Sequence, residues 1–493
     1  MFASFLPPFG ARSSIAPYLW VLYKQITHLA PNEVVFIGTP GYFQNPSNFD
    51  VAQNWDISHH SREYAGFDIP TYEQLDAYRR FLLPDKLFAE QEHHGLSPHE
   101  VMRQMLTTRI AELEISLRPI LAGLKHTDNI EAVFTWCNVP SLTAVAADLG
   151  IPVIHNELGA LRAPCYQWTA YFDFQGVNGA TEATSRFGQF QAEHAEQRVP
   201  ILSKGEILTL VLIDPGMLES TTPPEMAIGL PLQVEDDTNI IAFSNGWNNQ
   251  RLIDEANALH GHDNILIRHH PGGLKSYPDT SGLIDKSSSS IAFIRRCRQI
   301  ATINSSIGLE ALLWDVDTRI LGDSPIAIAA SKSMGPDACP PFPGEQLLAL
   351  NFLVFGYLIP YEFLYNPDYI RWRLGRPTEA AIFAFHLTYW RMKQRLLAER
   401  FRFRSGNDNL NNSGLLSSRL LHDYQLSQRI RELTAQVEML EARTHAIEET
   451  CERMRLSLSW RLTSPLRAID SLTGGKLRYL VSSERKTDGQ GHA

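Results

Sequence analysis

Short apolar runs alternate with helical stretches along the first 330 residues, and this alternation constrains the fold more than any other feature. Strands are predicted at 33–38, 131–136 and 151–155, and a helix at 140–149 connects the last two. This order favours parallel pairing, because a helix carries the chain back to begin the next strand in the same direction. The first part of the chain is therefore predicted to be an α/β lobe whose strand ends face a ligand site.

A second series of alternating elements begins near residue 239. It comprises strands at 240–243, 264–268, 300–303 and 318–321, and helices at 249–260, 290–297 and 307–313. The chain is therefore predicted to fold as two Rossmann-like lobes, 1–235 and 236–404, and a long helix at 378–404 closes the second lobe. Residues 158–235 are rich in Gly and Pro and are predicted to form an irregular connection.

Composition and charge limit the class of protein. Of the 493 residues, 44% are hydrophobic and 20% are charged, which is typical of chains with large buried cores. The formal net charge of −10 argues against a general nucleic-acid binder, so no nucleic-acid partner is expected. The five cysteines are scattered and never form a CxxC pair, so reduced thiols and a cytoplasmic location are expected. Neither a signal peptide nor a membrane-spanning apolar run is expected.

The C-terminal region follows a different pattern. After a polar linker at 405–424, apolar residues recur every three or four positions across 425–456. This heptad seam predicts a coiled coil and a homo-oligomer, and a single amphipathic helix packed on the body is the alternative. The seam consists of Ile430, Leu433, Val437, Leu440, Thr444, Ile447, Cys451 and Met454. The basic, amphipathic tail at 457–493 predicts peripheral contact with the inner membrane, and docking on an assembly partner is the alternative.

Acidic side chains occur at two points where they could carry chemistry. Glu157 follows a predicted strand within His-Asn-Glu-Leu-Gly, where it could take a proton from an acceptor hydroxyl. The alternative is a carboxylate that caps a turn or pairs with Arg162. Asp236 and Asp237 end the acidic run at 233–237, and one of them could attack an anomeric carbon. The alternative for this run is a solvated loop.

Basic and imidazole side chains follow a strand of the second lobe. Arg268, His269 and His270 precede a Pro-Gly-Gly sequence that forces an exposed turn. His270 could donate to a phosphate leaving group, and Arg268 and Lys275 could bind a phosphate or a carboxylate. Adjacent histidines can also bind a metal, but further ligands at metal-site spacing are missing, so no metal site is expected.

Polar side chains also mark the start of the helix at 307–313. Asn304, Ser305 and Ser306 lie between a predicted strand and this helix. Free backbone N–H groups and Ser hydroxyls at that point could bind a phosphate, and Glu310 could accept from a ribose hydroxyl. Ordinary capping of the helix is the alternative.

The four clusters, in their order, resemble those of the bacterial retaining β-Kdo transferases of the O-antigen and capsule type. The resemblance covers about residues 30–330 and rests on HNELG around Glu157, QVEDD at 233–237, the His-Pro turn at His270 and NSSIGLEA at 304–311. It implies a modified GT-B fold, CMP-β-Kdo as the donor and a saccharide or lipid-linked saccharide as the acceptor. It also implies that neither a metal nor another cofactor is required.

The resemblance further implies roles for individual residues. An aspartate nucleophile that forms a covalent Kdo adduct corresponds to Asp237, with Asp236 as the rival. His270 would assist the departure of CMP, and Glu157 would serve the acceptor. The donor-binding set is Arg268, His269, Lys275, Asn304, Ser305, Ser306 and Glu310. Two other functions stay open, a GT-B transferase for another nucleotide sugar and a non-catalytic scaffold of a polysaccharide assembly complex.

Overall fold

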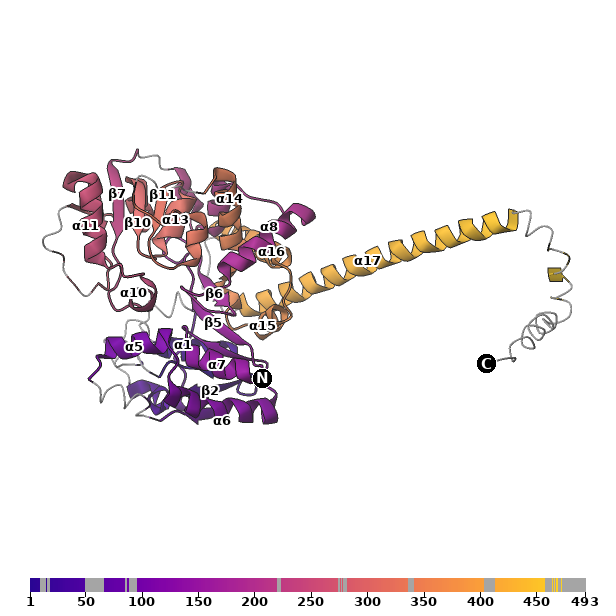
Figure 1. The fold of residues 1–493 in the computed structure, drawn as a ribbon, viewed down its shortest axis with the longest axis horizontal. Helices are drawn as coiled ribbons and strands as arrows, with labels where there is room; N and C mark the ends of the chain where they lie inside the picture. Colours follow the sequence, from indigo (N-terminus) through magenta and orange to yellow (C-terminus); the bar gives the residue numbers. More distant parts are fainter. Residues whose placement is uncertain are drawn as a thin grey trace, which may run out of the picture. The chain divides into compact units, whose positions relative to one another are not determined.

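The computed structural model describes residues 1–8, 15, 18–48, 66–84, 87, 95–219, 223–273, 275, 277, 282–335, 341–402 and 413–456, and positions 463, 465, 467, 468 and 471. The chain divides into two units, Met1–Leu421 and His422–Ala493. The first unit contains two α/β lobes, and the second contains most of one long helix (Figure 1). The predicted fold class, two Rossmann-like lobes followed by a helical extension, is therefore confirmed.

The first lobe is built on a seven-stranded sheet with the order β12-β6-β5-β4-β1-β2-β3. Strands β1 to β5 pair in parallel, whereas β6 and β12 run antiparallel to their neighbours. Every residue of β1, β2 and β4 is buried, as expected for parallel strands covered on both faces. The strands are Phe2–Phe5 (β1), Val34–Gly38 (β2), Arg80–Leu82 (β3), Ala132–Thr135 (β4), Val153–Leu158 (β5), Thr169–Asp173 (β6) and Leu358–Pro360 (β12).

Helices α5, α6 and α7 pack on one face of this sheet, where their apolar side chains and those of the strands form a single core. In α6, Leu113, Leu117, Leu121 and Leu124 recur every three or four residues and are all buried, so one stripe of the helix faces the sheet. The helices of this lobe are Leu19–His28 (α1), Tyr72–Asp76 (α3), Pro98–Thr107 (α5), Ala111–Asp128 (α6) and Pro140–Asp148 (α7).

The second lobe contains a five-stranded sheet with the order β11-β10-β7-β8-β9, and all neighbours pair in parallel. Its strands are Met226–Pro231 (β7), Ile265–Arg268 (β8), Leu283–Ile284 (β9), Cys297–Thr302 (β10) and Asp317–Ile320 (β11). Its helices are Thr238–Phe243 (α10), Asn249–His260 (α11), Ser290–Arg295 (α12) and Ile307–Leu313 (α13). Short 3₁₀ turns in the first unit are Pro40–Phe43, Pro46–Asn48, Pro215–Glu219, His262–Asn264, Pro325–Ala329 and Tyr361–Phe363.

Two predictions about the second lobe are wrong. Residues 240–243 lie in helix α10, because the Asp237 carboxylate caps its first turn and accepts from the Asn239 backbone N–H at 2.8 Å. A short apolar run fits a buried helical turn as well as a strand. The lobe boundary at 235/236 is also displaced, since β7 already pairs with β8 and β10 of the second sheet.

Residues 158–235 are more regular than predicted. They contain β6, the helices Ala183–Gln197 (α8) and Lys204–Val211 (α9), and β7. The chain also returns to the first lobe after the second, because β12 pairs with β6. The closing elements are Pro343–Asn351 (α14), a π-helical turn at Phe352–Tyr357 (η8), Pro367–Leu374 (α15) and Glu379–Arg402 (α16). A buried ion pair between Arg186 and Glu379, 2.7 Å long, joins α8 to α16.

The C-terminal region differs from the prediction at its start. Helix α17 runs from Ser413 to Leu456, so it begins inside the linker predicted at 405–424, whose residues 405–412 lie outside the described part. The seam at 425–456 is helical, and its association into a coiled coil stays a prediction. The tail predicted at 457–493 lies almost wholly outside the described residues. Within the described chain, no helix is long and apolar enough to cross a membrane.

Candidate active site

The strand order of each sheet reverses at one point, and open α/β sheets bind ligands beyond the carboxyl ends of the strands at such points. The reversal lies between β1 and β4 in the first sheet and between β7 and β10 in the second. The loops after β7 and β10 contain the predicted site residues 236, 237 and 304–306. The topology therefore selects segments that the motifs also indicated.

Side chains from both lobes come together in what we term the interlobe site, which consists of Glu157, Arg162, Asp237, His270 and Ser306. Arg162 donates from Nη2 to Ser306 Oγ at 3.2 Å, and this contact joins the loop after β5 to the start of α13. Besides burial, the charges of Asp237 and Arg162 act on the pKa values of both Glu157 and His270. Arg162 therefore contacts Ser306, and the charges of Arg162 and Asp237 both reach Glu157 and His270.

Glu157 stands at the end of β5, and its side chain is half-buried. Burial raises the pKa of its carboxyl group to about 8, and the neighbouring charge of Asp237 contributes. The Leu158 backbone N–H, which donates to Oε1 at 3.0 Å, and the charge of Arg162 act in the opposite direction. At neutral pH the Glu157 carboxyl therefore retains a proton in the free protein.

Asp237 is the exposed N-cap of α10, and half-buried Asp236 precedes it. Burial raises the pKa of the Tyr18 hydroxyl well above its ordinary value, and neighbouring negative charges, among them Asp237 and Asp236, raise it further. Both aspartates therefore lie near Tyr18 of the first lobe. Asp237 belongs to the interlobe site and Asp236 directly precedes it in the chain, and the role of either as nucleophile stays a prediction.

His270 follows β8, and its ring accepts a hydrogen bond through Nδ1 from the Gly272 backbone N–H at 3.0 Å. Because Nδ1 is an acceptor, the neutral ring carries its proton on Nε2, an assignment made from the hydrogen bond. Burial lowers the pKa of His270, although the charge of Asp237 opposes this shift. A neutral His270 therefore has an Nε2–H that can donate to a phosphate oxygen.

Arg162 is the cation of the interlobe site, and the sequence indicated it only as a structural partner of Glu157. Its charge also acts on the pKa values of His270 and Glu310. Arg162 is exposed, so part of its guanidinium is accessible to a ligand. No spacing rule identifies this residue, because its contact with Ser306 spans 144 positions.

Arg268, the cation that the sequence favoured, has a structural partner in place of the expected ligand. Its Nη1 donates to the fully buried carboxylate of Asp285 and, at 3.2 Å, to the carbonyl oxygen of Ser287. This pairing has a physical reason, since the buried Asp285 carboxylate requires cations to offset its desolvation, and Arg296 provides a second one at 3.3 Å. Arg268 therefore connects the end of β8 to the segment after β9.

Asn304 also has a structural role. The Gln233 side chain bonds Asn304 twice, as an acceptor from its backbone N–H at 3.1 Å and as a donor to Oδ1 at 2.9 Å. Asn304 Nδ2 donates to the carbonyl oxygens of Asn239 and Phe243, each at 3.1 Å. The amide of Asn304 therefore holds α10 against the end of β10 and is engaged by protein on both sides.

Glu310 lies in α13 and is buried. Its Oε2 accepts from Ser290 Oγ at 2.6 Å, so one oxygen has a protein partner in place of the ribose hydroxyl that the sequence indicated. Burial raises the pKa of Glu310 to about 7, whereas the Ser290 hydrogen bond and the charge of Arg162 act against this shift. Ser305 Oγ accepts from the Ile307 backbone N–H at 3.4 Å, a weak capping contact.

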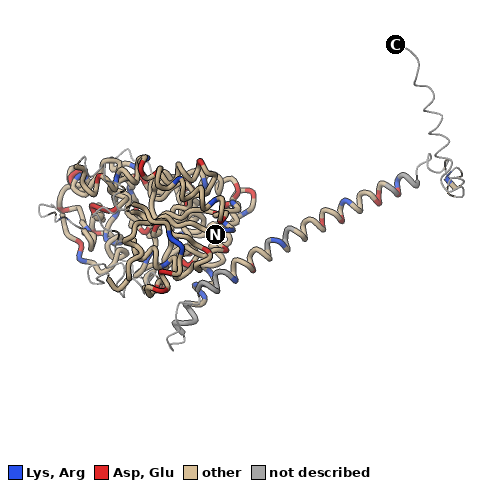
Figure 2. The backbone as a smooth tube through the Cα atoms, turned by 90° about the horizontal axis from the view of Figure 1, so that it is seen from below, with Lys and Arg blue, Asp and Glu red and all other residues tan. Residues whose placement is uncertain are grey.

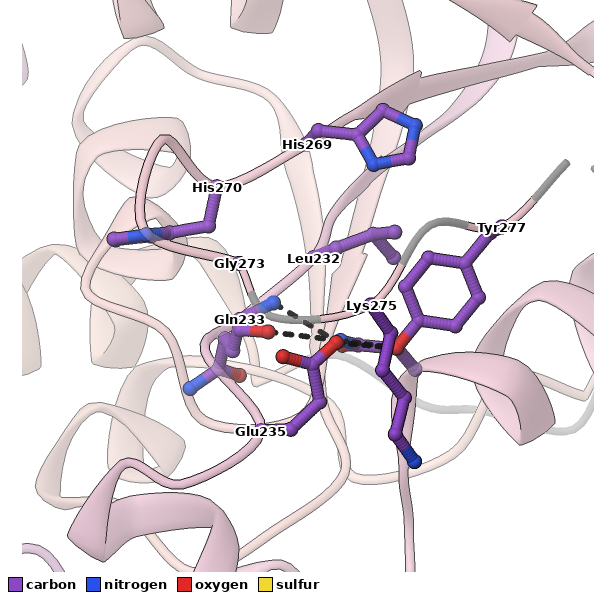
Figure 3. Close-up of a pocket in the computed structure, with 9 residues that line it drawn as sticks. Leu232, Gln233, Glu235, His269, His270, Gly273, Lys275 and Tyr277 are labelled. Carbon is purple, nitrogen blue, oxygen red and sulfur yellow. Dashed lines mark hydrogen bonds between the residues drawn. The ribbon is translucent and has the colours of Figure 1, made fainter. Parts of the chain in front are cut away.

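A pocket of about 420 Å³ shares His270 with the interlobe site (Figure 3). The residues lining it are Leu232, Gln233, Glu235, Asn249, His269, His270, Gly273, Lys275 and Tyr277. Within it, the Tyr277 hydroxyl donates to Glu235 Oε1 at 2.7 Å, and Asn249 Nδ2 donates to that hydroxyl at 3.0 Å. The predicted residues His269 and Lys275 thus line the same pocket as Asn249 and Tyr277, which the sequence analysis missed.

Metal binding receives no positive indication from the side chains. Across the described residues, no group of three or more His, Cys, Asp and Glu side chains is arranged to hold a metal ion.

Residues 4–182 match the family model of the Glycosyltransferase 99 family N-terminal domain. The matched segment includes Glu157 and Arg162. A search among curated proteins returns no match.

Solved structures show distant likenesses. The KpsC β-Kdo 2,7 transferase of Thermosulfurimonas dismutans has 16% identity and a TM-score of 0.34, over 49% of this chain and 82% of that chain. The KpsC β-Kdo 2,4 transferase of the same organism has 13% identity and a TM-score of 0.31, over 45% and 79%. The spinosyn rhamnosyltransferase SpnG has 10% identity and a TM-score of 0.25, over 87% and 99%. The family match and the two-lobed α/β fold together support a glycosyltransferase.

Proposed function

We propose that this glycosyltransferase is a retaining β-Kdo transferase that moves Kdo from CMP-β-Kdo to a saccharide acceptor of a surface polysaccharide. The observation that carries the proposal is the gathering of Glu157, Asp237 and His270 at one site. These are the residues for which the sequence resemblance implies chemistry, and they come from three separate segments. The family match of residues 4–182 supports the class of enzyme.

In the first step, the Asp237 carboxylate attacks the anomeric carbon of Kdo. A carbon–oxygen bond forms to Asp237, and the bond from the anomeric carbon to the CMP phosphate oxygen breaks with its electron pair on CMP. The Nε2–H of neutral His270 donates to the departing phosphate, and the positive charge of Arg162 offsets the charge that develops there. Asp236 is the alternative nucleophile at the same site.

In the second step, an acceptor hydroxyl attacks the anomeric carbon from the face opposite Asp237. The ester bond to Asp237 breaks, the carboxylate is restored, and Glu157 takes the hydroxyl proton, so two inversions give net retention. Glu157 must first lose its own proton to solvent. Esterification favours this loss, because it removes the Asp237 charge that contributes to the raised pKa of Glu157.

The proposed reaction uses no metal ion and no cofactor. Arg162 takes the donor-binding role that the sequence gave to Arg268, because Arg162 lies at the interlobe site and Arg268 pairs with buried Asp285. A guanidinium can bind a phosphate or carboxylate through two hydrogen bonds, which suits the anionic donor. Lys275 and His269 are proposed to contact the part of the donor that enters the adjoining pocket.

The donor and the nucleophile are tested together by CMP release from CMP-Kdo in the presence of EDTA. We expect turnover by the wild type, and CMP binding without turnover by Asp237→Ala. Mass spectrometry of the wild type without acceptor should show a Kdo adduct on Asp237. If Asp236→Ala abolishes the adduct and Asp237→Ala does not, the nucleophile is Asp236. Turnover of a different nucleotide sugar in place of CMP-Kdo would refute the proposed donor. Failure to turn over any sugar in a full donor panel would favour the non-catalytic scaffold.

The role of Arg162 is tested with a matched pair of variants, Arg162→Gln and Arg268→Gln. Loss of charge-assisted hydrogen bonds worth about 1.5–3 kcal/mol should weaken CMP binding about 10- to 150-fold in Arg162→Gln. Arg268→Gln should instead reduce stability, while its folded fraction binds CMP as the wild type does. Titration calorimetry distinguishes these results, and unchanged CMP binding by Arg162→Gln would exclude the proposed role.

A further inference from the structure

Helix α17 has a stripe of large apolar side chains that the helix itself leaves exposed. Leu433 is 44% exposed and Ile430 is 62% exposed, although both are large apolar side chains. The exposed members of the stripe are Leu426, Ile430, Leu433, Val437, Leu440 and Ile447. The first five alternate by four and three residues, and Ile447 follows seven positions after Leu440, so all six fall at the a and d positions of a heptad repeat. A stripe of this spacing is complementary to a second helix of the same kind.

We propose that residues 426–454 form a parallel, in-register, two-stranded coiled coil with a second copy of this chain. The first three a positions carry Ile430, Val437 and Thr444, which are all β-branched, and Cys451 is at the fourth. The d positions from 426 to 440 carry leucine, and Ile447 follows at the next d position. β-Branched residues at a with leucine at d favour two parallel strands over three or four, because each side chain then enters its hole in a preferred rotamer.

Charges beside the seam favour the same arrangement. Acidic and basic residues are interspersed along α17 (Figure 2). In a parallel pair, each g position faces the e position five residues later in the partner. Arg443 at g then faces Glu448 of the second copy, and their opposite charges attract each other. Gln436 at g faces Glu441, and this pair brings no like charges together. Both pairs occur twice by symmetry.

An antiparallel pair of the same seam is disfavoured by charge. In that orientation, e positions of one helix face e positions of the other. When both helices are centred on the midpoint of 426–454, Glu441 lies beside Glu441 of the second copy. Two like charges on facing e positions destabilise the antiparallel pair. The antiparallel pair also lacks the attraction between Arg443 and Glu448 that the parallel pair gains.

The seam also has a defined beginning. The heptad positions before Leu426 are Asp423 at a and Arg419 at d, which do not pack in an apolar seam. The unit boundary between Leu421 and His422 lies in this break. The proposed dimer therefore requires only α17, and it is independent of the donor proposed above. It gives two catalytic units per particle, and both basic tails leave the same end of the coiled coil.

The stoichiometry is tested on the full chain by sedimentation equilibrium at micromolar concentration, with two variants of adjacent residues. Leu440→Glu places a carboxylate in the seam and should raise the dimer dissociation constant at least about 100-fold, giving monomer. Met439→Glu is the matched control, because Met439 is 64% exposed at a c position outside the seam and should leave the dimer intact. Circular dichroism serves as the check that both variants remain folded.

The orientation is tested by oxidation of Ile430→Cys in a chain with Cys339→Ser and Cys451→Ser. In the parallel pair, the two introduced thiols face each other and should form an interchain disulfide. In the antiparallel pair, they are about 30 Å apart along the axis and cannot do so. A monomeric or trimeric wild type, a dimer that survives Leu440→Glu, or a dimer without the cross-link would each overturn the proposal.

Discussion

Replacement of Glu157 by Gln should stabilise the first unit, and the gain should grow as the pH rises. Burial and the charge of Asp237 hold the pKa of Glu157 at about 8 in the folded protein, whereas an unfolded Glu has a pKa of about 4.3. Between these values, the folded protein keeps a proton that the unfolded chain has released. Unfolding therefore releases a proton, and the stability of the wild type falls as the pH rises through this window. The amide of the Glu157→Gln variant does not titrate, so the variant escapes this loss.

The magnitude follows from linkage. One proton contributes about 1.4 kcal/mol per pH unit, so a pKa of about 8 corresponds to a loss of about 2 kcal/mol between pH 6 and pH 8. Glu157 is only half-buried, and solvent screening reduces the expected loss to about 1 kcal/mol. The neighbouring carboxyl of Glu310, with a pKa of about 7, titrates in both proteins and largely cancels in the difference.

The assay is urea unfolding of the wild type and Glu157→Gln at pH 6, 7 and 8, followed by tryptophan fluorescence. The difference in unfolding free energy should widen by about 1 kcal/mol from pH 6 to pH 8. Exposed Glu255 provides the control, since Glu255→Gln should give no widening. A difference that stays constant or narrows with pH would refute the raised pKa, and with it the reasoning that Glu157 needs adduct formation to become a base.

Three further predictions concern single residues. His270→Ala should lower the rate of CMP release about 10²- to 10³-fold at saturating donor, because it removes a donor to the leaving phosphate; steady-state kinetics measure this. Asn304→Ala should cost about 1–3 kcal/mol in urea unfolding, since it removes the hydrogen bonds that the amide makes with Asn239, Phe243 and Gln233, while CMP binding by the folded fraction persists. Arg186→Ala should destabilise by about 3–5 kcal/mol, because it leaves the buried Glu379 carboxylate unpaired; Arg186→Ala combined with Glu379→Gln should recover part of this loss.

Local patterns explain why much of the fold was predictable. Strands β8 and β10 and helices α11 and α13 have buried apolar residues at the spacing of their own element, so their positions follow from short stretches of sequence. This reasoning fails for the run at 240–243, because four consecutive apolar residues show no periodicity that distinguishes a helical turn from a strand. The deciding contact is the cap by Asp237, which depends on backbone geometry.

The candidate site was predictable in part for the same reason. Glu157 and His270 follow strands that the sequence predicts, at 151–155 and 264–268, and the carboxyl ends of such strands face a ligand site, so these two positions could be anticipated. Asp237 follows β7, a strand that the sequence did not predict. The roles of Asn304 and Glu310 could not, because Gln233 and Ser290, their partners, lie 71 and 20 positions away. A polar residue at a strand end can face a ligand or a neighbouring loop, and the sequence does not distinguish these cases.

The sequence by itself determined most of the alternating elements of both lobes and the strand ends at which Glu157 and the two histidines lie, because these properties depend on residues that are near one another in the chain. Only the tertiary structure decided which cation lies at the interlobe site. Arg268 is adjacent to the histidines in sequence, yet Asp285 draws it into a structural pair. Arg162 reaches Ser306 across 144 positions, because folding and not chain proximity brings the two lobes together at this point.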